Sequence, residues 1–295
     1  MPELPEVETI ARGLAQRVTG DSIEAVWLGS KPEPLKSPPR EIAGALEGSR
    51  IFAVRRVGKH IVFDLEKDGV GISGRRSAGK TSDRKSRTDE GVRATQSRVT
   101  QFIVHLGMTG RLQVCEADAE IAKHTHAIAK LASGRELRFV DPRRFGRLSV
   151  ASGFEAGGVE PLEAVFEQFL ALFRGRKTPI KSALLNQKLL RGVGNIYADE
   201  SLFRAGIRPR RRAAAIRREQ FAKLLDAVKE VLREAITAGG SSVSDYVNAD
   251  GDEGFFQLQH RVYGREGEPC LVCGTPIKRV VIAGRSSHYC PRCQR

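Results

Sequence analysis

The sequence predicts a multidomain α+β protein: an N-terminal β-sandwich with a leading helix, then a helical bundle, then a cysteine-rich hairpin. Short β-prone runs separated by turn signals fill the first half of the chain. Apolar residues recur at helical spacing in the second half. Two Cys-x-x-Cys pairs lie near the C-terminus. With 295 residues, the chain is long enough to form two domains with cores of their own.

The first nine residues, MPELPEVET, lead into a predicted helix. Pro5 suits the first helical turn, and Glu6 and Glu8 suit the positive end of the helix dipole. One face of the helix is apolar and would bury against the core: Val7, Ile10, Ala11, Leu14 and Val18. The plainest interpretation of the stretch is therefore a helix N-terminus.

A second interpretation of this stretch is chemical. Because Pro2 is small, Met1 is readily removed, and the chain then begins with a secondary amine. An α-amino group has a pKa of about 7.7 to 8.0, so part of it is neutral near pH 7. Such an amine can attack an aldehyde-level carbon and form an iminium ion, and Glu3 lies beside it to give or take a proton.

Eight β-prone runs predict the strands of the first domain, residues 1–152. They span 23–28, 50–57, 60–65, 102–106, 110–115, 126–131, 136–140 and 146–150. The segment 69–98 does not fit this domain, because it has eight Lys or Arg against three Asp or Glu and few apolar residues. We expect a disordered basic insertion there, either a tolerated surface loop or a contributor to non-specific DNA affinity.

The segment 153–162 contains Gly157, Gly158 and Pro161 and predicts a hinge. The helical domain is expected over 163–266, with helices at 163–173, 181–190 and 216–238, the last ended by Gly239 and Gly240. The remaining residues, 267–295, form the cysteine-rich module.

The charge of the chain predicts a polyanionic partner. Lys plus Arg number 49 and Asp plus Glu 35, which gives a net charge of +14. Nucleic acid is favoured over a membrane, because the sequence has no long apolar run and no signal-peptide pattern. We therefore expect a soluble, cytoplasmic protein.

The four cysteines of the two pairs predict one structural zinc ion. Sixteen residues separate Cys270-x-x-Cys273 from Cys290-x-x-Cys293, the arrangement of a zinc ribbon. Two such pairs supply the four thiolates of a tetrahedral site. Disulfides are disfavoured in the cytoplasm. The short module holds little apolar core, so its folding is expected to require the metal.

Three further strings carry candidate functional residues: HLGMTG at 105–110, DPRRFG at 141–146 and GVGNIYADESL at 192–202. On local evidence Met108 could fill a core, and DPRRFG could be a loop that ends in the core. Alternatively, Arg143 could pair with an orphaned base while Phe145 enters between bases as a wedge that kinks DNA. Gly192 and Gly194 open a helix, whose exposed N–H groups suit a phosphate.

Taken in order, MPELPEVET and these three strings resemble the bacterial formamidopyrimidine-DNA glycosylases over nearly the whole chain apart from 69–98. The resemblance implies a helix-two-turns-helix DNA-binding domain, a monomer, and a double-stranded DNA substrate containing oxidised bases. It also implies an enzyme that is both a DNA glycosylase and an abasic-site lyase. The enzyme would remove 8-oxoguanine and formamidopyrimidines through a Schiff base and then cut the strand by β,δ-elimination, without a catalytic metal.

The same resemblance assigns roles to residues. Pro2 would be the nucleophile and Glu3 the proton donor, with Lys59 and Arg285 assisting the chemistry. The residues implied to contact DNA are Met108, His124, Arg143, Phe145, Lys177, Lys181 and Asn195. Residues 241–254 match a loop that closes over the extruded base, and Ser244 stands where some relatives carry a basic residue.

Two alternatives stay open on the sequence. The endonuclease VIII branch uses the same amine on oxidised pyrimidines, but it typically has Gly where this chain has Leu4. A non-catalytic zinc-dependent damage-binding protein would bind lesions without cutting, which the presence of Pro2 and Glu3 argues against. The ranking of lesions, the preferred opposite base, the role of the insertion and the removal of Met1 are not given by the sequence.

Overall fold

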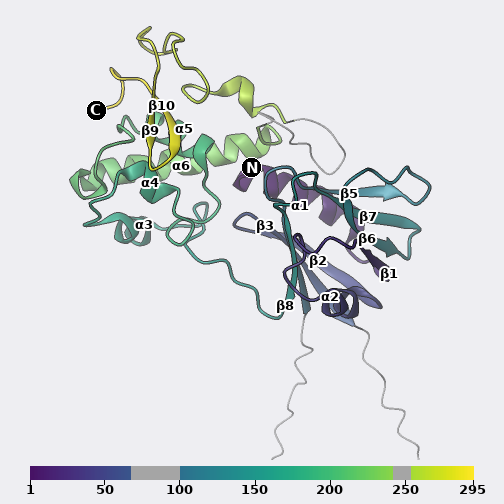
Figure 1. Cartoon of the computed structure of the whole chain (residues 1–295). Helices are drawn as coiled ribbons and strands as arrows, with labels where there is room; N and C mark the ends of the chain where they lie inside the picture. Colours follow the sequence, from purple (N-terminus) through teal and green to yellow (C-terminus); the bar gives the residue numbers. More distant parts are fainter. Residues whose placement is uncertain (68–99, 242–253) are drawn as a thin grey trace, which may run out of the picture.

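The structure, a computed structural model, describes residues 1–67, 100–241 and 254–295. The predicted insertion at 69–98 and Ser244 of the predicted lesion loop therefore lie outside the described residues. Among the helices of the described ranges, none combines the length and the apolar character needed to cross a membrane. Figure 1 shows a sheet-containing part and a helical part that meet where the chain begins.

The first part begins with helix α1 (Leu4–Val18) and contains an eight-stranded antiparallel sheet. The sheet order is β5-β7-β6-β1-β2-β3-β4-β8. Each predicted strand is confirmed to within two residues at either end: β1 (Ser22–Leu28), β2 (Ser49–Val57), β3 (His60–Lys67), β4 (Thr100–His105), β5 (Arg111–Glu116), β6 (Thr125–Leu131), β7 (Arg135–Val140) and β8 (Arg147–Ala151).

The sheet consists of two halves that enclose one core. Only two residue pairs, Ser22 with Arg50 and Ile23 with Ser49, join β1 to β2 at the corner between the halves. Phe63 of one half and Phe139 of the other are buried in the same apolar cluster as the inward face of α1. This is the sandwich that the sequence predicts, with its two layers still hydrogen-bonded at one corner.

The sequence prediction missed one helix of this part, α2 (Pro39–Leu46). It is short, it begins at the second proline of the pair at 38–39, and Ile42 and Leu46 are its buried residues. Two apolar residues on two turns give too weak a periodicity to stand out against a proline-rich segment.

The second part contains α3 (Phe166–Phe173), α4 (Ile180–Leu184), α5 (Asn195–Arg204) and α6 (Arg218–Thr237), with short 3₁₀ turns at Ala213–Ala215 and Phe256–Gln259. The predicted helix at 181–190 is corrected to the five-residue α4. The chain turns after it, because the Asn186 side chain accepts a hydrogen bond from the Lys188 N–H. The long predicted helix is confirmed as α6, and Gly239 and Gly240, both with positive φ, end it.

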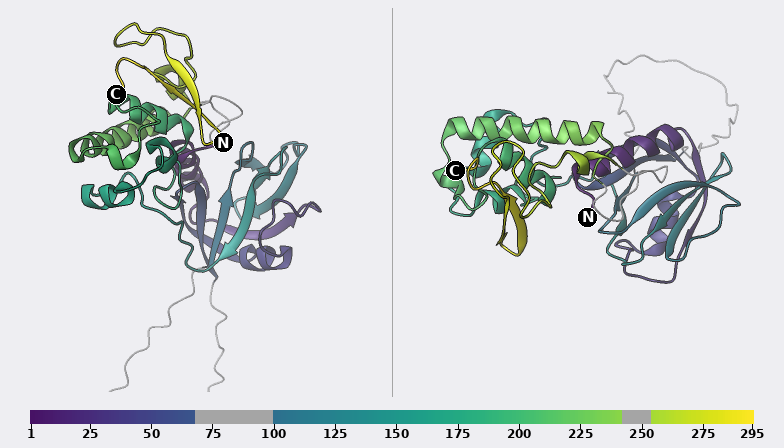
Figure 2. Two further views of the ribbon diagram at one scale, coloured as in Figure 1. Left: turned by 60° about the vertical axis from the view of Figure 1, so that its left-hand side comes forward. Right: turned by 90° about the horizontal axis from the view of Figure 1, so that it is seen from above.

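The chain ends in a hairpin of β9 (Lys278–Ile282) and β10 (Arg285–Tyr289). Ala283 and Gly284, with φ of 47° and 76°, form its turn. Figure 2 shows this hairpin attached to the helical part and lying near the N-terminus. The hairpin therefore brings Arg285 toward the beginning of the chain.

Buried contacts fix the junction between the two parts. Leu4, at the start of α1, belongs to the apolar core of the helical part and donates its N–H to Gly192 O. Arg56 of β2 pairs with Glu8 at 2.7 Å and with Glu160 at 2.9 Å. The N-terminus is therefore held on both sides rather than frayed.

Candidate active site and nucleic-acid interface

The Glu3 side chain lies against the first turn of α5. Glu3 is 5% exposed, and its Oε1 accepts a hydrogen bond from the Ile196 N–H at 3.3 Å. A Cβ on Gly194 would lie 2.1 Å from Glu3 Cδ, so the glycine makes room for the carboxyl group. The helix end that the sequence suggests as a phosphate seat therefore receives Glu3.

Burial raises the pKa of Glu3 to about 7, and Glu6 adds to this effect while Lys59 opposes it. A carboxyl group with this pKa is partly protonated at neutral pH. It can give a proton and then be stabilised as a carboxylate by the positive charge of Lys59.

The terminal amine lies among the same charged groups. Burial lowers its pKa, Glu3 and Glu6 raise it, and Lys59 and Arg143 lower it further. In the full chain this amine belongs to Met1, and Pro2 next to it is half-buried. Burial also lowers the pKa of Lys59, and Arg285 contributes in the same direction. Glu3, Lys59 and Arg143, from three different segments of the fold, thus surround the terminal amine, and Arg285 lies near Lys59.

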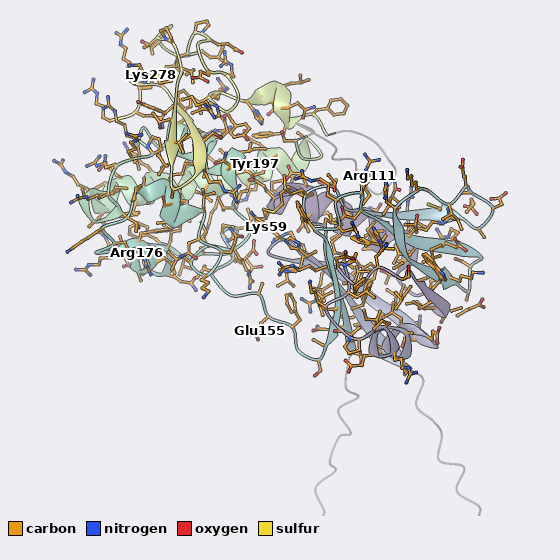
Figure 3. All side chains as sticks on the ribbon, in the orientation of Figure 1. Lys59, Arg111, Glu155, Arg176, Tyr197 and Lys278 are labelled. Atoms are coloured by element: carbon orange, nitrogen blue, oxygen red, sulfur yellow. The ribbon has the colours of Figure 1, made fainter. Side chains whose placement is uncertain are left out.

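Glu6 is a site residue that the sequence analysis assigned only to the helix dipole. It is buried, and its Oε2 accepts the Glu3 N–H at 2.8 Å. Its Oε1 accepts the Ser241 N–H at 2.8 Å and the Tyr197 hydroxyl. Burial raises its pKa against these hydrogen bonds. The spacing of Glu3 and Glu6, which is that of a capping box, is the signal that could have found it. Figure 3 shows Tyr197 in the helical part and Lys59 in the sheet-containing part, on the two sides of the junction between these parts.

Lys181 lies elsewhere than the predicted DNA surface. It is fully buried, and its Nζ donates to Asp199 Oδ1 and to Ser286 O, each at 2.7 Å. Asp199 Oδ2 accepts the His288 N–H at 2.8 Å. Burial lowers the pKa of Lys181 and Asp199 raises it. An ammonium group enclosed in this way cannot touch a duplex, and it instead holds strand β10 against α5.

The hairpin and the segment before it have further anchors on α5. Asn195 Nδ2 donates to Ser286 Oγ at 3.3 Å. The Glu200 carboxylate accepts the N–H groups of Arg261, Val262 and Tyr263 at 2.8 to 3.0 Å. Arg285 itself is exposed at the end of the hairpin, free to meet a phosphate.

Four of the predicted duplex-contacting residues lie on exposed turns of the sheet-containing part. Met108 is 42% exposed between β4 and β5, and Phe145 is 53% exposed before β8. The Arg143 guanidinium lies 4.9 Å from the centre of the Phe145 ring. His124 is exposed just before β6, with a φ of 73°. An exposed aromatic beside an arginine can unstack a base step and reach the base left behind.

Lys177 is not brought to the N-terminus. It is exposed in the segment between α3 and α4. Arg176 beside it lies well away from Lys59 in Figure 3. Lys177 is therefore suited to a backbone phosphate at a distance from the reacting sugar.

The four predicted cysteine ligands come together in the C-terminal module. Their Sγ atoms lie within 4.8 Å of one another, with Cys270 and Cys293 at 3.9 Å and Cys273 and Cys290 at 3.5 Å. Zinc bound at about 2.3 Å from each sulfur of a tetrahedron implies S–S edges of about 3.8 Å. The sulfurs therefore fit one structural zinc ion.

Comparison with known proteins agrees with this geometry along the whole chain. Three family models match: the formamidopyrimidine-DNA glycosylase N-terminal domain at residues 1–148, the H2TH domain of the same enzymes at 158–247, and the zinc finger found in FPG and IleRS at 267–295. A formamidopyrimidine-DNA glycosylase of Solibacter usitatus is 44% identical over 299 residues, with all of both chains covered.

Solved structures give the same result. The crystal structure of the MutM (Fpg) protein from Thermus thermophilus is 38% identical with a TM-score of 0.79, and the match covers 99% of this chain and 98% of that one. A structure of MutM in complex with DNA containing carbocyclic 8-oxo-G is 30% identical with a TM-score of 0.82 and full coverage of both chains. The chain therefore belongs to the formamidopyrimidine-DNA glycosylase family.

Proposed function

We propose that this protein is a base-excision-repair DNA glycosylase and abasic-site lyase that removes oxidised purines from double-stranded DNA. The observation that carries the proposal is the buried Glu3 beside the terminal amine, with Lys59 close to both groups and Arg285 close to Lys59. The family and its members bound to 8-oxo-G DNA support the substrate class. The protein acts as a single chain, and a DNA substrate is consistent with a cytoplasmic, nucleoid-associated location.

The first chemical step assigns the nucleophile to Pro2. Once Met1 is removed, the neutral Pro2 nitrogen attacks C1′ of the extruded nucleotide, and the bond from C1′ to the ring oxygen O4′ breaks while Glu3 gives its proton to O4′. In the full chain, burial lowers the pKa of the Met1 amine, and the same surroundings would favour a neutral Pro2 amine that can attack. The Pro2 nitrogen then gives up its proton, and its lone pair forms the iminium ion with C1′ as the bond between C1′ and the base breaks. The base leaves with the electron pair of that bond and takes up the proton.

The second stage cuts the strand. The iminium acidifies the C2′ proton, and its removal breaks the bond from C3′ to its oxygen. Loss of a further proton then breaks the bond from C5′ to its oxygen, so both flanking phosphates are released. Water finally hydrolyses the Schiff base and restores the amine. We assign Arg285 to the phosphate beside the lesion, because it is exposed at the end of a hairpin that buried contacts hold in place.

The remaining sequence-predicted residues keep DNA-holding roles in this proposal. Met108, Phe145 and Arg143 fill the space of the extruded nucleotide and contact the opposite base. His124, Lys177 and Asn195 contact backbone phosphates. Lys181, which is fully buried, positions β10 instead.

Cys270, Cys273, Cys290 and Cys293 would hold the zinc ion, which supplies folding energy to the module and no chemistry to the sugar. We also propose that the domain boundaries lie after residues 152, 162 and 266.

The proposal is tested by product analysis on duplexes with a single 8-oxoguanine opposite cytosine. We expect release of the oxidised base and a one-nucleotide gap with a phosphate at each end, and slower action on a thymine glycol duplex. Pro2→Gly should abolish both activities at unchanged thermal stability. Faster excision of thymine glycol would favour the pyrimidine-directed alternative, and tight lesion binding without any cleavage would contradict an enzymatic role.

A further inference from the structure

Asp141 links the two turns that carry the residues proposed to enter the duplex, and it is the first residue of one of them. One turn, 106–110, carries Met108, and the other, 141–146, carries Arg143 and Phe145. Both Met108 and Phe145 are substantially exposed, whereas Asp141 is fully buried. A buried carboxylate is costly unless hydrogen bonds satisfy it, so its partners indicate what it holds.

The Asp141 carboxylate bonds to both turns at once. Oδ1 accepts the Thr109 hydroxyl at 2.6 Å and the Arg143 N–H at 3.2 Å. Oδ2 accepts the Gly146 N–H at 2.7 Å. One oxygen therefore reaches the residue after Met108, while both oxygens bracket the turn that contains Phe145. Hydrogen bonds to a charged acceptor are the stronger kind, which suits a fixed geometry.

The backbone of the same residue reaches the third DNA-facing turn. The Asp141 N–H donates to His124 O at 3.0 Å. His126 Nε2 lies 3.0 Å from Asp141 O. Asp141 thus connects the turns that carry Met108, His124, Arg143 and Phe145.

Gly107 allows the two turns to touch backbone to backbone. It has a φ of 66°, and a Cβ there would lie 2.5 Å from Phe145 C and 2.6 Å from Gly146 N. A Cβ on Gly146 would instead lie 2.5 Å from Cζ of the buried Phe139 ring. A side chain at Gly107 would therefore force the turns apart, so the Asp141 bonds act across a closely packed contact.

We propose that Asp141 is a positioning residue that holds Met108, Arg143 and Phe145 as one rigid unit, so that all three enter the duplex together. The inference rests on the proposed function, because it concerns how that function extrudes its nucleotide. It does not make Asp141 a catalytic residue, since no bond to the reacting sugar is required of it. Its effect is to avoid the ordering cost of three independent side chains at the moment of insertion.

The test is Asp141→Asn, which keeps the shape of the side chain but replaces one acceptor oxygen with an NH₂ group. The matched control is Asp64→Asn, another buried aspartate of the sheet part, which accepts hydrogen bonds from Arg55 and Gln101 away from these turns. Insertion is followed by the fluorescence of 2-aminopurine placed next to the base opposite the lesion. Excision of 8-oxoguanine gives kcat/KM.

We expect Asp141→Asn to lower kcat/KM and the rate of the fluorescence change by roughly 10- to 100-fold, as for a misplaced group. Asp64→Asn should stay within about twofold of wild type, because its bonds lie away from these turns. In a background of Met108→Ala and Phe145→Ala, the loss caused by Asp141→Asn should be smaller than in wild type, because Arg143 is the one side chain of the three that remains to be positioned. An equal loss in that background, or no loss in the wild-type background, would overturn the inference.

Two features keep the experiment decisive. If Asp141→Asn does not unfold cooperatively and is therefore misfolded, Thr109→Val replaces it, because this variant removes one hydrogen bond and keeps the carboxylate. The same comparison in the Met108→Ala and Phe145→Ala background then applies. Thr109→Ser, which keeps the hydroxyl, is expected to restore the rate. The fluorescence change requires insertion but no excision. A wild-type protein that inserts but releases no base would therefore count against the proposed function, while the effect of Asp141→Asn on insertion would still be measured.

Discussion

The carboxyl group of Glu3 occupies the space that any side chain at Gly194 would need, since a Cβ there would lie 2.1 Å from Glu3 Cδ. Two segments far apart in the chain thus meet without a gap. The N-terminus supplies the acid, and the opening turn of α5 supplies the Ile196 N–H that binds it. Glu3 is positioned by a residue whose important property is the absence of a side chain.

Gly194→Ala is therefore expected to displace Glu3 and to lower excision of 8-oxoguanine roughly 100-fold. The matched control is Gly157→Ala, because a Cβ at Gly157 would meet nothing within 4 Å. Single-turnover excision by the two purified variants measures the difference. Equal rates for both would show that the close approach at Gly194 does not matter for the chemistry.

The raised pKa of Glu3 predicts that a higher pH lowers the stability of the wild-type protein and increases the stability gained by Glu3→Gln. A carboxyl group whose pKa is about 7 in the folded protein and about 4.5 unfolded contributes stability below pH 4.5, and this contribution is lost as the pH rises toward 7. Glu3→Gln should therefore stabilise the fold above pH 7, by up to about 3 kcal/mol, and the gain should shrink as the pH falls. Urea unfolding at pH 6 and pH 8 tests this. A gain that grows on acidification would contradict the buried, protonated Glu3.

The same group predicts the alkaline limb of the activity profile. Because Glu3 must be protonated to give its proton to O4′, single-turnover base release should fall as the pH rises above about 7. Glu3→Gln should be slow at every pH and should lack this limb. A wild-type rate that keeps rising to pH 9 would exclude Glu3 as the proton donor.

Removing Arg56 should destabilise the junction of the two parts. Its side chain is 7% exposed and pairs with Glu8 and Glu160, so Arg56→Ala would remove the buried link between these two carboxylates, which would keep only Arg12 and Arg191 as partners. The expected loss is about 1.5 to 3 kcal/mol, because hydrogen bonds to charged groups are lost. Arg12→Ala is the control, because Arg12 also pairs with Glu8 but is 64% exposed, and its loss should stay below about 1 kcal/mol. Similar losses for both variants would show that the buried ion pairs of Arg56 do not stabilise the junction.

Asp199 is expected to position Arg285, because it holds the hairpin of β9 and β10 in place. Asp199→Asn weakens the hold on Lys181 and on the His288 N–H, so Arg285 should lose its position while zinc stays bound. We expect slower incision of a preformed abasic site, and no additional loss when Arg285→Ala is combined with it. Asp226→Asn, at an exposed position of α6, serves as the control. Fully additive losses would argue against positioning of Arg285 by Asp199.

The fold could be predicted largely from local patterns, whereas the site could be predicted only in part. Short β-prone runs between turn signals predicted the eight strands, and the cysteine spacing predicted the metal cluster, because both signals are local in the sequence. The short α2 and the end of α4 escaped, because a proline-rich segment and an Asn186 turn leave little periodicity.

The residues that organise the site escaped for a different reason. Glu6, Asp141 and Asp199 each satisfy groups distant in sequence, such as Ser241, Thr109 and His288. Lys181 is a predicted DNA contact in the sequence, because nothing near it in sequence reveals its buried partner Asp199. Burial of a charged side chain depends on partners that only the folded chain brings together.

The most direct test of the central claim is borohydride trapping with a duplex that contains 8-oxoguanine opposite cytosine, followed by peptide mass analysis. We expect a covalent DNA adduct on Pro2 of a chain that lacks Met1, absent from Pro2→Gly and formed more slowly by Glu3→Gln. Lesion-specific binding without any adduct, or an adduct on a lysine such as Lys59, would contradict the assignment of the terminal amine as the nucleophile.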